Sequence, residues 1–109
     1  MAIQNGKIIA IGQSLDVLTI FPGKNKITQI DASKKHLTCG IVDEHSHIAI
    51  SKGVNESSQA VTAEVSIGDV INSTDRNIYR QLAGGVTTSQ LLHGSANPIG
   101  GQSAIVKLR

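Results

Sequence analysis

Hydrophobic and polar residues alternate in short runs along the first part of the chain, with turn-forming residues between them. The runs at 2–4 and 7–11 are joined by Asn5-Gly6, a dipeptide in which both residues accept the positive φ angles of a type I′ turn. This pattern predicts an N-terminal β-hairpin. Residues 27–31 alternate in the same way and are expected to form a half-buried strand. Residues 15–20 fit either a strand or a short helical turn.

Two apolar stretches further along the chain, residues 40–50 and 86–92, have the character of buried strands. The first is followed by a polar segment, residues 51–59, that is rich in Ser, Asn and Gly and is expected to form a loop. A helical pattern over residues 75–83 separates the strands. Strand, helix and strand in this order predict a βαβ unit with a parallel sheet.

The limits of the predicted helix follow from residues that cap helices. The oxygens of residues 72–74 are candidates for the N-cap, and Gly84 is expected to supply a left-handed stop. Ile78 and Leu82 share one face of the helix at a spacing of four residues. A further strand is expected at 103–108.

The first apolar stretch ends in two histidines separated by one residue. His45 and His47 would share one face of a strand with Cα atoms about 6–7 Å apart, a span that suits two imidazoles binding one metal ion. The same alternation places Asp43 on that face, where its carboxylate could hydrogen-bond a ligand. A His-x-His pair alone lies more often on a solvated surface than at a metal site. The full run is Gly40-Ile41-Val42-Asp43-Glu44-His45-Ser46-His47.

This run resembles the metal-binding signature of the amidohydrolase superfamily, in which two histidines end the first strand of a (β/α)₈ barrel. The similarity extends over nearly the whole chain. Residues 3–12 resemble the N-terminal hairpin of the family, and residues 30–40 resemble the segment leading into the barrel. Residues 82–88 and 94–102 resemble the first helix, second strand and following loop of the imidazolonepropionase-like branch.

Two positions depart from the family pattern. Cys39 stands where proline usually precedes the metal-binding strand, which loosens the local backbone and leaves the histidines untouched. Lys34 stands where the family usually carries a glycine, so a non-glycine residue is expected at positive φ.

The resemblance implies an α/β fold in two parts. Residues 1–39 would form part of a small N-terminal β-sandwich-like domain, and residues 40–109 the first βαβ portion of an incomplete TIM-type (β/α)₈ barrel. A complete barrel takes about 250 residues, whereas this chain has 109. We therefore expect the N-terminal portion of a longer enzyme, inactive by itself.

For the longer enzyme, the resemblance implies metal-dependent hydrolysis of a C–N bond in an amide, a cyclic amide or a dipeptide-like substrate. His45 and His47 would bind a divalent metal, expected to be zinc, with one or two ions per site. Asp43 would orient a ligand without binding the metal, and the catalytic residues would lie beyond Arg109. A ring deaminase of the same superfamily and a non-catalytic β-rich binding module are the alternatives.

The loop after the second predicted strand would face the same barrel mouth as the histidine pair, since the loops at the C-terminal ends of barrel strands carry the chemistry. His93, Asn97 and Gln102 are its candidates for substrate contact. For His93 the favoured interpretation is a structural loop histidine, because the ligands of the family come from later strands. Gly100-Gly101 in the same loop allows close approach of the backbone to another group.

The composition limits the classes of partner that the chain is expected to bind. The formal net charge is +2 and the basic residues are scattered, so no stripe suggests nucleic acid. No apolar run reaches the ~20 residues of a membrane span, and no signal-peptide pattern opens the chain. The compartment is undetermined: cytoplasmic by default, or secreted if a signal peptide has been removed. A single cysteine, Cys39, excludes an internal disulfide. We expect a small-molecule substrate and, because strand edges would be exposed, a homo-oligomer.

Overall fold

The computed structural model describes residues 1–13, 16, 19 and 27–109. Most of the segment 15–20, for which strand and helical turn both remained open, lies outside the described residues. The chain divides into two compact units, Met1–Leu37 and Thr38–Arg109. Each is described by itself.

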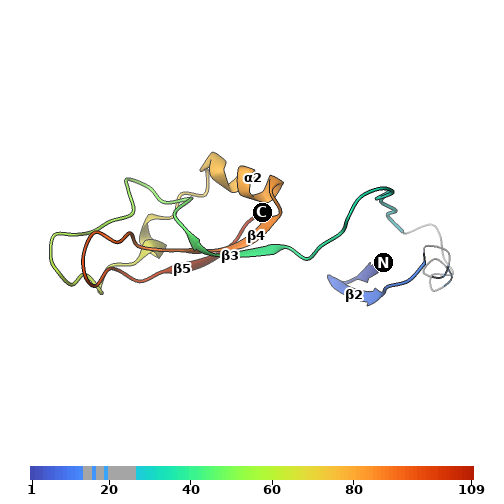
Figure 1. Cartoon of the computed structure of the whole chain (residues 1–109), viewed down its shortest axis with the longest axis horizontal. Coiled ribbons are helices and arrows are strands. Elements are labelled where there is room, and N and C mark those ends of the chain that lie inside the picture. The colour runs from blue at the N-terminus through green and yellow to red at the C-terminus, as the bar shows by residue number, and fades with distance from the viewer. Residues whose placement is uncertain (14–15, 17–18, 20–26) are drawn as a thin grey trace. The chain divides into compact units, whose positions relative to one another are not determined.

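The first unit contains the predicted hairpin (Figure 1). Strand β1 (Ala2–Gln4) pairs antiparallel with β2 (Lys7–Ala10), and Gln4 lies opposite Lys7 across a two-residue turn. The turn residues have φ angles of 53° at Asn5 and 73° at Gly6. Both are positive, as a type I′ turn requires, so the prediction of the hairpin is confirmed.

The prediction of a strand over residues 27–31 is wrong. The backbone there has no strand hydrogen bonding, and Ile30 is 86% exposed. Among the described residues no third strand joins the β1–β2 sheet, so the alternating pattern has no neighbour to pair with. The expectation for Lys34 is confirmed, because its φ is 62°.

The second unit is built on a three-stranded sheet with the order β3-β4-β5 (Figure 1). Strands β3 (Ile41–Ser46) and β4 (Val86–Leu91) are parallel, and helix α2 (Arg76–Ala83) lies between them in sequence. This is the predicted βαβ unit. Strand β5 (Ala104–Lys107) pairs antiparallel with β4. The described chain is thus a mixed α/β structure, and these three strands do not form a barrel.

Helix α2 begins one residue later than predicted and ends at Ala83, as predicted, but both capping residues differ from the prediction. The N-cap is Asp75 and not a residue of 72–74, since the Asp75 carboxylate accepts the backbone N–H of Asn77. At the other end Gly84 is right-handed, with φ −82°. Gly85 takes the left-handed conformation, with φ 93°, so it supplies the stop assigned to Gly84.

The core of the second unit centres on Leu91 of β4, which is fully buried. Ala49 and Ile67 complete the buried cluster, and Ile67 begins the short 3₁₀ helix η2 (Ile67–Val70). Partly buried apolar residues from α2, β5 and the segment after β3 pack against it: Ile48, Ile50, Ile78, Ala104 and Val106.

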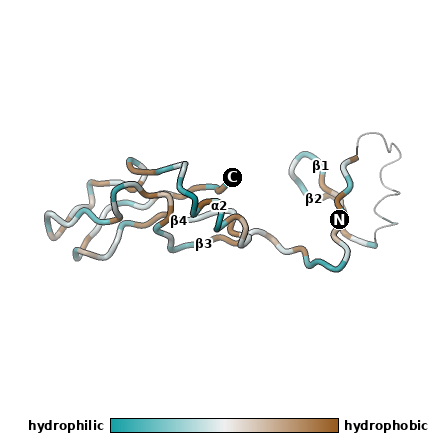
Figure 2. Tube along the Cα trace, turned by 90° about the horizontal axis from the view of Figure 1, so that it is seen from above, coloured by the Kyte–Doolittle hydropathy of each residue, from teal (hydrophilic) through white to brown (hydrophobic). Residues whose placement is uncertain are grey.

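The apolar residues are distributed in short stretches along the trace (Figure 2). Among the residues that the structure describes, no helix is long and apolar enough to span a bilayer. Several apolar side chains of β3 and β5 are exposed, with Val42 at 68% and Ile105 at 75%. The described residues leave most of the surface of these side chains uncovered.

Candidate functional site

The two histidines of the motif come together at the end of β3. His45 is the last residue but one of the strand, and His47 follows the strand directly. Their ring centroids are 5.3 Å apart and the ring planes meet at 83°. Both side chains are exposed. The imidazoles are therefore adjacent and open to a ligand, as the spacing predicted.

The orientation of the His47 ring is set by the neighbouring strand. Its Nδ1 lies 2.9 Å from the carbonyl oxygen of Leu92. Because a carbonyl oxygen can only accept a hydrogen bond, Nδ1 is the donor, and in a neutral ring the lone pair then lies on Nε2. Histidines that bind metals commonly donate their second ring N–H to a backbone carbonyl in this way. This hydrogen bond thus favours the tautomer that leaves Nε2 available to a ligand.

Asp43 lies near the pair but contacts the backbone and not a ring. Its Oδ1 accepts the backbone N–H of His45 at 3.2 Å. The strand register shifts here, with Asp43 opposite Ser89 and Ser46 opposite Leu91. Three residue steps on β3 therefore match two on β4, which interrupts the simple alternation that placed Asp43 on the histidine face.

The part of the chain that the structure describes contains no group of three or more His, Cys, Asp or Glu side chains arranged to hold a metal ion. A catalytic zinc site takes three protein ligands and leaves one position open. Among the described residues, His45 and His47 therefore lack a third side chain with which they could complete such a site. Cys39 is exposed and free.

Asn97 and Gln102 connect two loops. The Asn97 amide donates hydrogen bonds to the carbonyl oxygens of Glu56 and Gln59 and to the hydroxyl of Thr62, at 2.8–3.2 Å. Gln102 donates through Nε2 to the carbonyl of Ala63 at 3.0 Å. In this structure both amide groups tie the loop after β4 to the loop after β3. A role in substrate contact stays a prediction.

His93 also joins these loops. The backbone N–H of Glu56 donates to His93 Nε2 at 2.7 Å, and His93 Nδ1 lies 2.7 Å from the carbonyl of Gly94. Both ring nitrogens are therefore engaged within the chain. His93 is not part of a three-residue metal group among the described residues.

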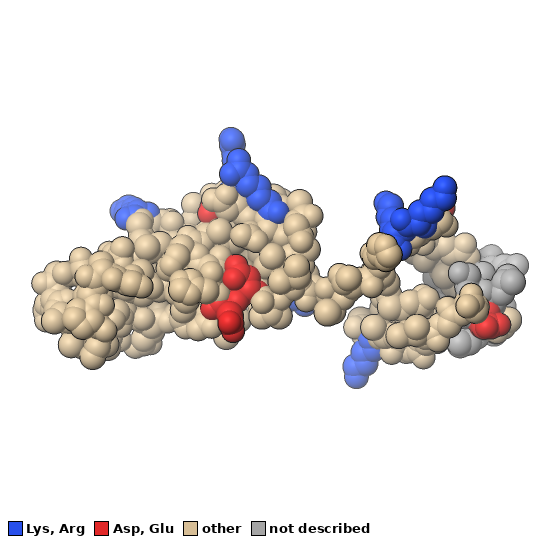
Figure 3. Space-filling view, in the orientation of Figure 1, with Lys and Arg blue, Asp and Glu red and all other residues tan. Residues whose placement is uncertain are grey.

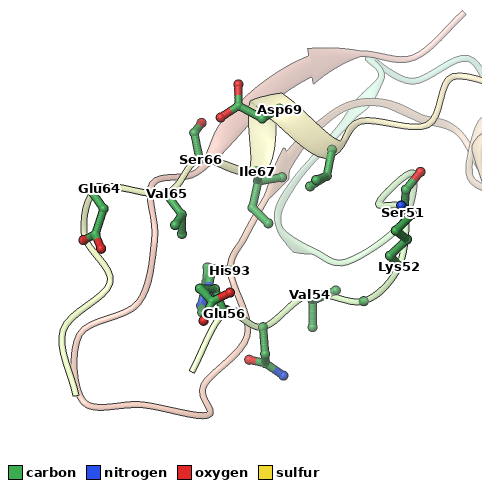
Figure 4. Close-up of a pocket in the computed structure, with 13 residues that line it drawn as sticks. Ser51, Lys52, Val54, Glu56, Glu64, Val65, Ser66, Ile67, Asp69 and His93 are labelled. Atoms are coloured by element: carbon green, nitrogen blue, oxygen red, sulfur yellow. Dashed lines mark hydrogen bonds between the residues drawn. The ribbon is translucent and has the colours of Figure 1, made fainter. Parts of the chain in front are cut away.

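A pocket of about 430 Å³ lies beside His93 (Figure 4). Val54, Val65 and Ile67 line it together with charged residues of the same loops. Among these, the pKa of Glu56 is lowered, because its carboxylate accepts hydrogen bonds from the side chain and the backbone N–H of Ser58. The sequence predicted a loop over residues 51–59 but no pocket. The pocket forms because the fold brings residues 64–70 and His93 against this loop.

Charged side chains are sparse on the face of the second unit seen in Figure 3, where the lysine and arginine side chains stand apart from one another. This view shows no continuous basic surface.

Comparison with known proteins gives a consistent assignment. No family model matches the chain. An amidohydrolase named tasK from Hapsidospora irregularis is 39% identical over 85 residues, covering 71% of this chain and 9% of that protein. Imidazolonepropionase from Halobacterium salinarum is 40% identical over 47 residues, covering 43% of this chain and 11% of that protein.

A crystal structure of an amidohydrolase from Thermotoga maritima MSB8 superposes with a TM-score of 0.69 and 31% sequence identity. The match covers 99% of this chain and 28% of that one. The chain thus spans about a tenth of the length of the curated relatives and about a quarter of the solved structure. The chain belongs to the amidohydrolase superfamily, as its sequence indicated.

Proposed function

We propose that this chain is the segment of a metal-dependent hydrolase that contributes the first two metal ligands, His45 and His47. The substrate would be an amide, a cyclic amide or a dipeptide-like compound cleaved at a C–N bond. The complete enzyme would be a (β/α)₈ barrel that begins with β3, α2 and β4. The names of the relatives support hydrolysis, and the parallel βαβ unit supports the barrel.

The observation that carries the proposal is the state of the His47 ring. Its Nδ1 is occupied by the Leu92 carbonyl, so Nε2 is free as an acceptor and the ring cannot easily rotate away. The ring of His45 lies next to it at 5.3 Å. Two imidazoles at this separation fit zinc or a similar divalent ion.

A metal bound there would lower the pKa of a coordinated water from ~15.7 to about 7, which supplies hydroxide at neutral pH. The chain's own residues hold the ligands in place. Leu92 orients the His47 ring, and Asp43 fixes the backbone of His45 by accepting its N–H. The exposed position of both rings leaves room for a substrate and for further ligands.

The test is metal content and hydrolysis in the full-length protein. His45→Ala and His47→Ala should each reduce bound zinc, measured by elemental analysis, and abolish hydrolysis of a panel of N-acyl amino acids, dipeptides and cyclic amides. His36→Ala is the matched control, because His36 is also exposed but belongs to the other unit. Its metal content and activity should equal those of the unaltered protein.

The same panel separates the alternatives. Ammonium release from ring substrates, without hydrolysis of the amides, would indicate a deaminase. Unchanged metal content in both variants, or no turnover in a metal-loaded protein, would overturn the proposal and favour a binding module.

A further inference from the structure

The imidazole of His93 lies where three loop segments meet. It accepts the backbone N–H of Glu56 through Nε2 and contacts the carbonyl of Gly94 through Nδ1. An imidazole whose Nε2 accepts a hydrogen bond must be neutral there, so the proton is on Nδ1 and is donated to Gly94. Both hydrogen bonds exist together in only this one tautomer.

The third segment is Gly100-Gly101, and the His93 ring accounts for its lack of side chains. A Cβ added at Gly100 would lie 2.5 Å from His93 Nδ1. One added at Gly101 would lie 3.1 Å from His93 Cδ2 and 2.5 Å from Cγ2 of Val65. The two glycines therefore let the backbone approach the ring closely.

His93 directly follows the residue that orients the candidate metal ligand His47. The carbonyl oxygen of Leu92 accepts a hydrogen bond from His47 Nδ1, and the N–H of Leu92 donates one to the carbonyl oxygen of Ser46 at 3.0 Å. On the other side, Gly94 donates its N–H to the carbonyl of Val54 at 2.7 Å. The segment 92–94 is thus bound to the end of β3 and to the following loop, with His93 between these two attachments.

We propose that His93 is a positioning residue for the metal site. By fixing the segment 92–94 against Glu56, it holds the Leu92 carbonyl where it selects the tautomer and orientation of the His47 ring. The inference rests on the proposed function, in which His47 binds the metal. It gives His93 a role without placing it in contact with metal or substrate.

The test compares three substitutions in the full-length protein. His93→Gln keeps an acceptor near the position of Nε2, His93→Asn keeps a donor near Nδ1, and His93→Phe keeps only the ring volume. Zinc affinity is measured by competition with a chromophoric chelator. The tautomer of His47 is read from the ring nitrogens by long-range ¹H–¹⁵N NMR on the metal-free protein.

Residues that orient a metal ligand contribute about 10- to 100-fold to affinity, and His93 acts one step further away. We expect His93→Phe to weaken zinc binding by about tenfold, the lower end of that range, and to give the His47 ring a mixture of tautomers. His93→Gln should restore affinity and tautomer better than His93→Asn. His36→Ala should change neither measurement.

The two readouts separate this inference from the proposed function. If the unaltered protein binds no zinc, the proposed function fails, and the tautomer of His47 in the metal-free protein still tests His93. An unchanged His47 tautomer in a folded His93→Phe protein overturns the inference. If the His93→Phe protein does not fold, the other two variants decide. The same His47 tautomer mixture in His93→Gln and His93→Asn overturns the inference.

Discussion

His47 Nδ1 and the carbonyl oxygen of Leu92 lie 2.9 Å apart, although 45 residues separate them in sequence. They meet because β3 and β4 are parallel and end at the same level, where Leu92 also donates its N–H to Ser46. The end of one strand thus orients a side chain of the other. This relationship fixes the orientation of the His47 ring beside that of His45.

His45→Ala and His47→Ala should leave the protein folded. Both side chains are exposed, and substitutions at such positions usually change the free energy of unfolding by less than about 0.5 kcal/mol. His47→Ala should cost somewhat more, up to about 1 kcal/mol, because it loses a hydrogen bond. Urea denaturation of the full-length protein without added metal measures both. A loss of several kcal/mol for His45→Ala would show that this ring is part of the core.

Asp43→Asn should reduce activity less than either histidine substitution. The asparagine amide oxygen can still accept the backbone N–H of His45, which is the hydrogen bond that the carboxylate accepts here. Comparing kcat/KM for Asp43→Asn and His45→Ala checks this. A larger loss for Asp43→Asn would mean that its charge acts directly in the chemistry.

Asp75 should make the second unit sensitive to acid. Its pKa is lowered from the ordinary value of 3.8, first by the backbone N–H of Asn77 and then by that of Ala49. A carboxyl whose pKa is lower in the folded protein stabilises it fully above the unfolded value, and this contribution is lost as pH falls through the folded pKa. The free energy of unfolding, measured from pH 7 down to pH 2, should therefore fall less steeply below about pH 4 in the Asp75→Asn variant than in the unaltered protein. Asp69→Asn is the control, because Asp69 is exposed whereas Asp75 is partly buried. The same dependence of stability on pH in all three proteins would contradict the prediction.

Leu91→Ala should be severely destabilising, by about 2–5 kcal/mol, because it opens a cavity at a fully buried position. Ile105→Ala removes an apolar side chain that is 75% exposed and should have little effect. Chemical denaturation of the two variants tests where the core lies. Equal losses would mean that the exposed face of β5 is covered in the full-length protein.

The isolated 109-residue chain should self-associate. Val42 on β3 and Ile105 on β5 are mostly exposed, and uncovered apolar strands are prone to pair with another copy. Light scattering should show a dimer or larger assembly, which Val42→Lys with Ile105→Lys should reduce. A monodisperse monomer at high concentration would show that the chain closes a core by itself.

Local signals in the sequence were sufficient for some elements. Asn5-Gly6 determines its turn because both residues tolerate positive φ, and the helix is marked by Ile78 and Leu82 on one face. Residues 27–31 carry the pattern of a strand, but pairing requires a partner that no local pattern specifies. The cap at Asp75 was missed because an aspartate also fits the first turn of a helix.

The geometry of the candidate site was predictable only where it depends on a single strand. The spacing of His45 and His47 indicated their meeting, since it depends on one strand. The hydrogen bond from Glu56 to His93 joins residues 37 positions apart, and the register shift after Asp43 depends on pairing with β4. Neither is encoded in a short stretch of sequence.

The strand order β3-β4-β5 has a consequence for the sequence of events in folding. Strand β4 reaches β5 across a short connection, with Gln90 and Ser103 only 13 positions apart, whereas β3 must close a loop of 45 positions to bring His47 to Leu92. The entropy lost in loop closure rises with length, and distant pairings form slowly. We therefore expect the β4–β5 hairpin to form first and β3 to dock afterwards, so that the histidine pair acquires its final geometry among the last events of folding.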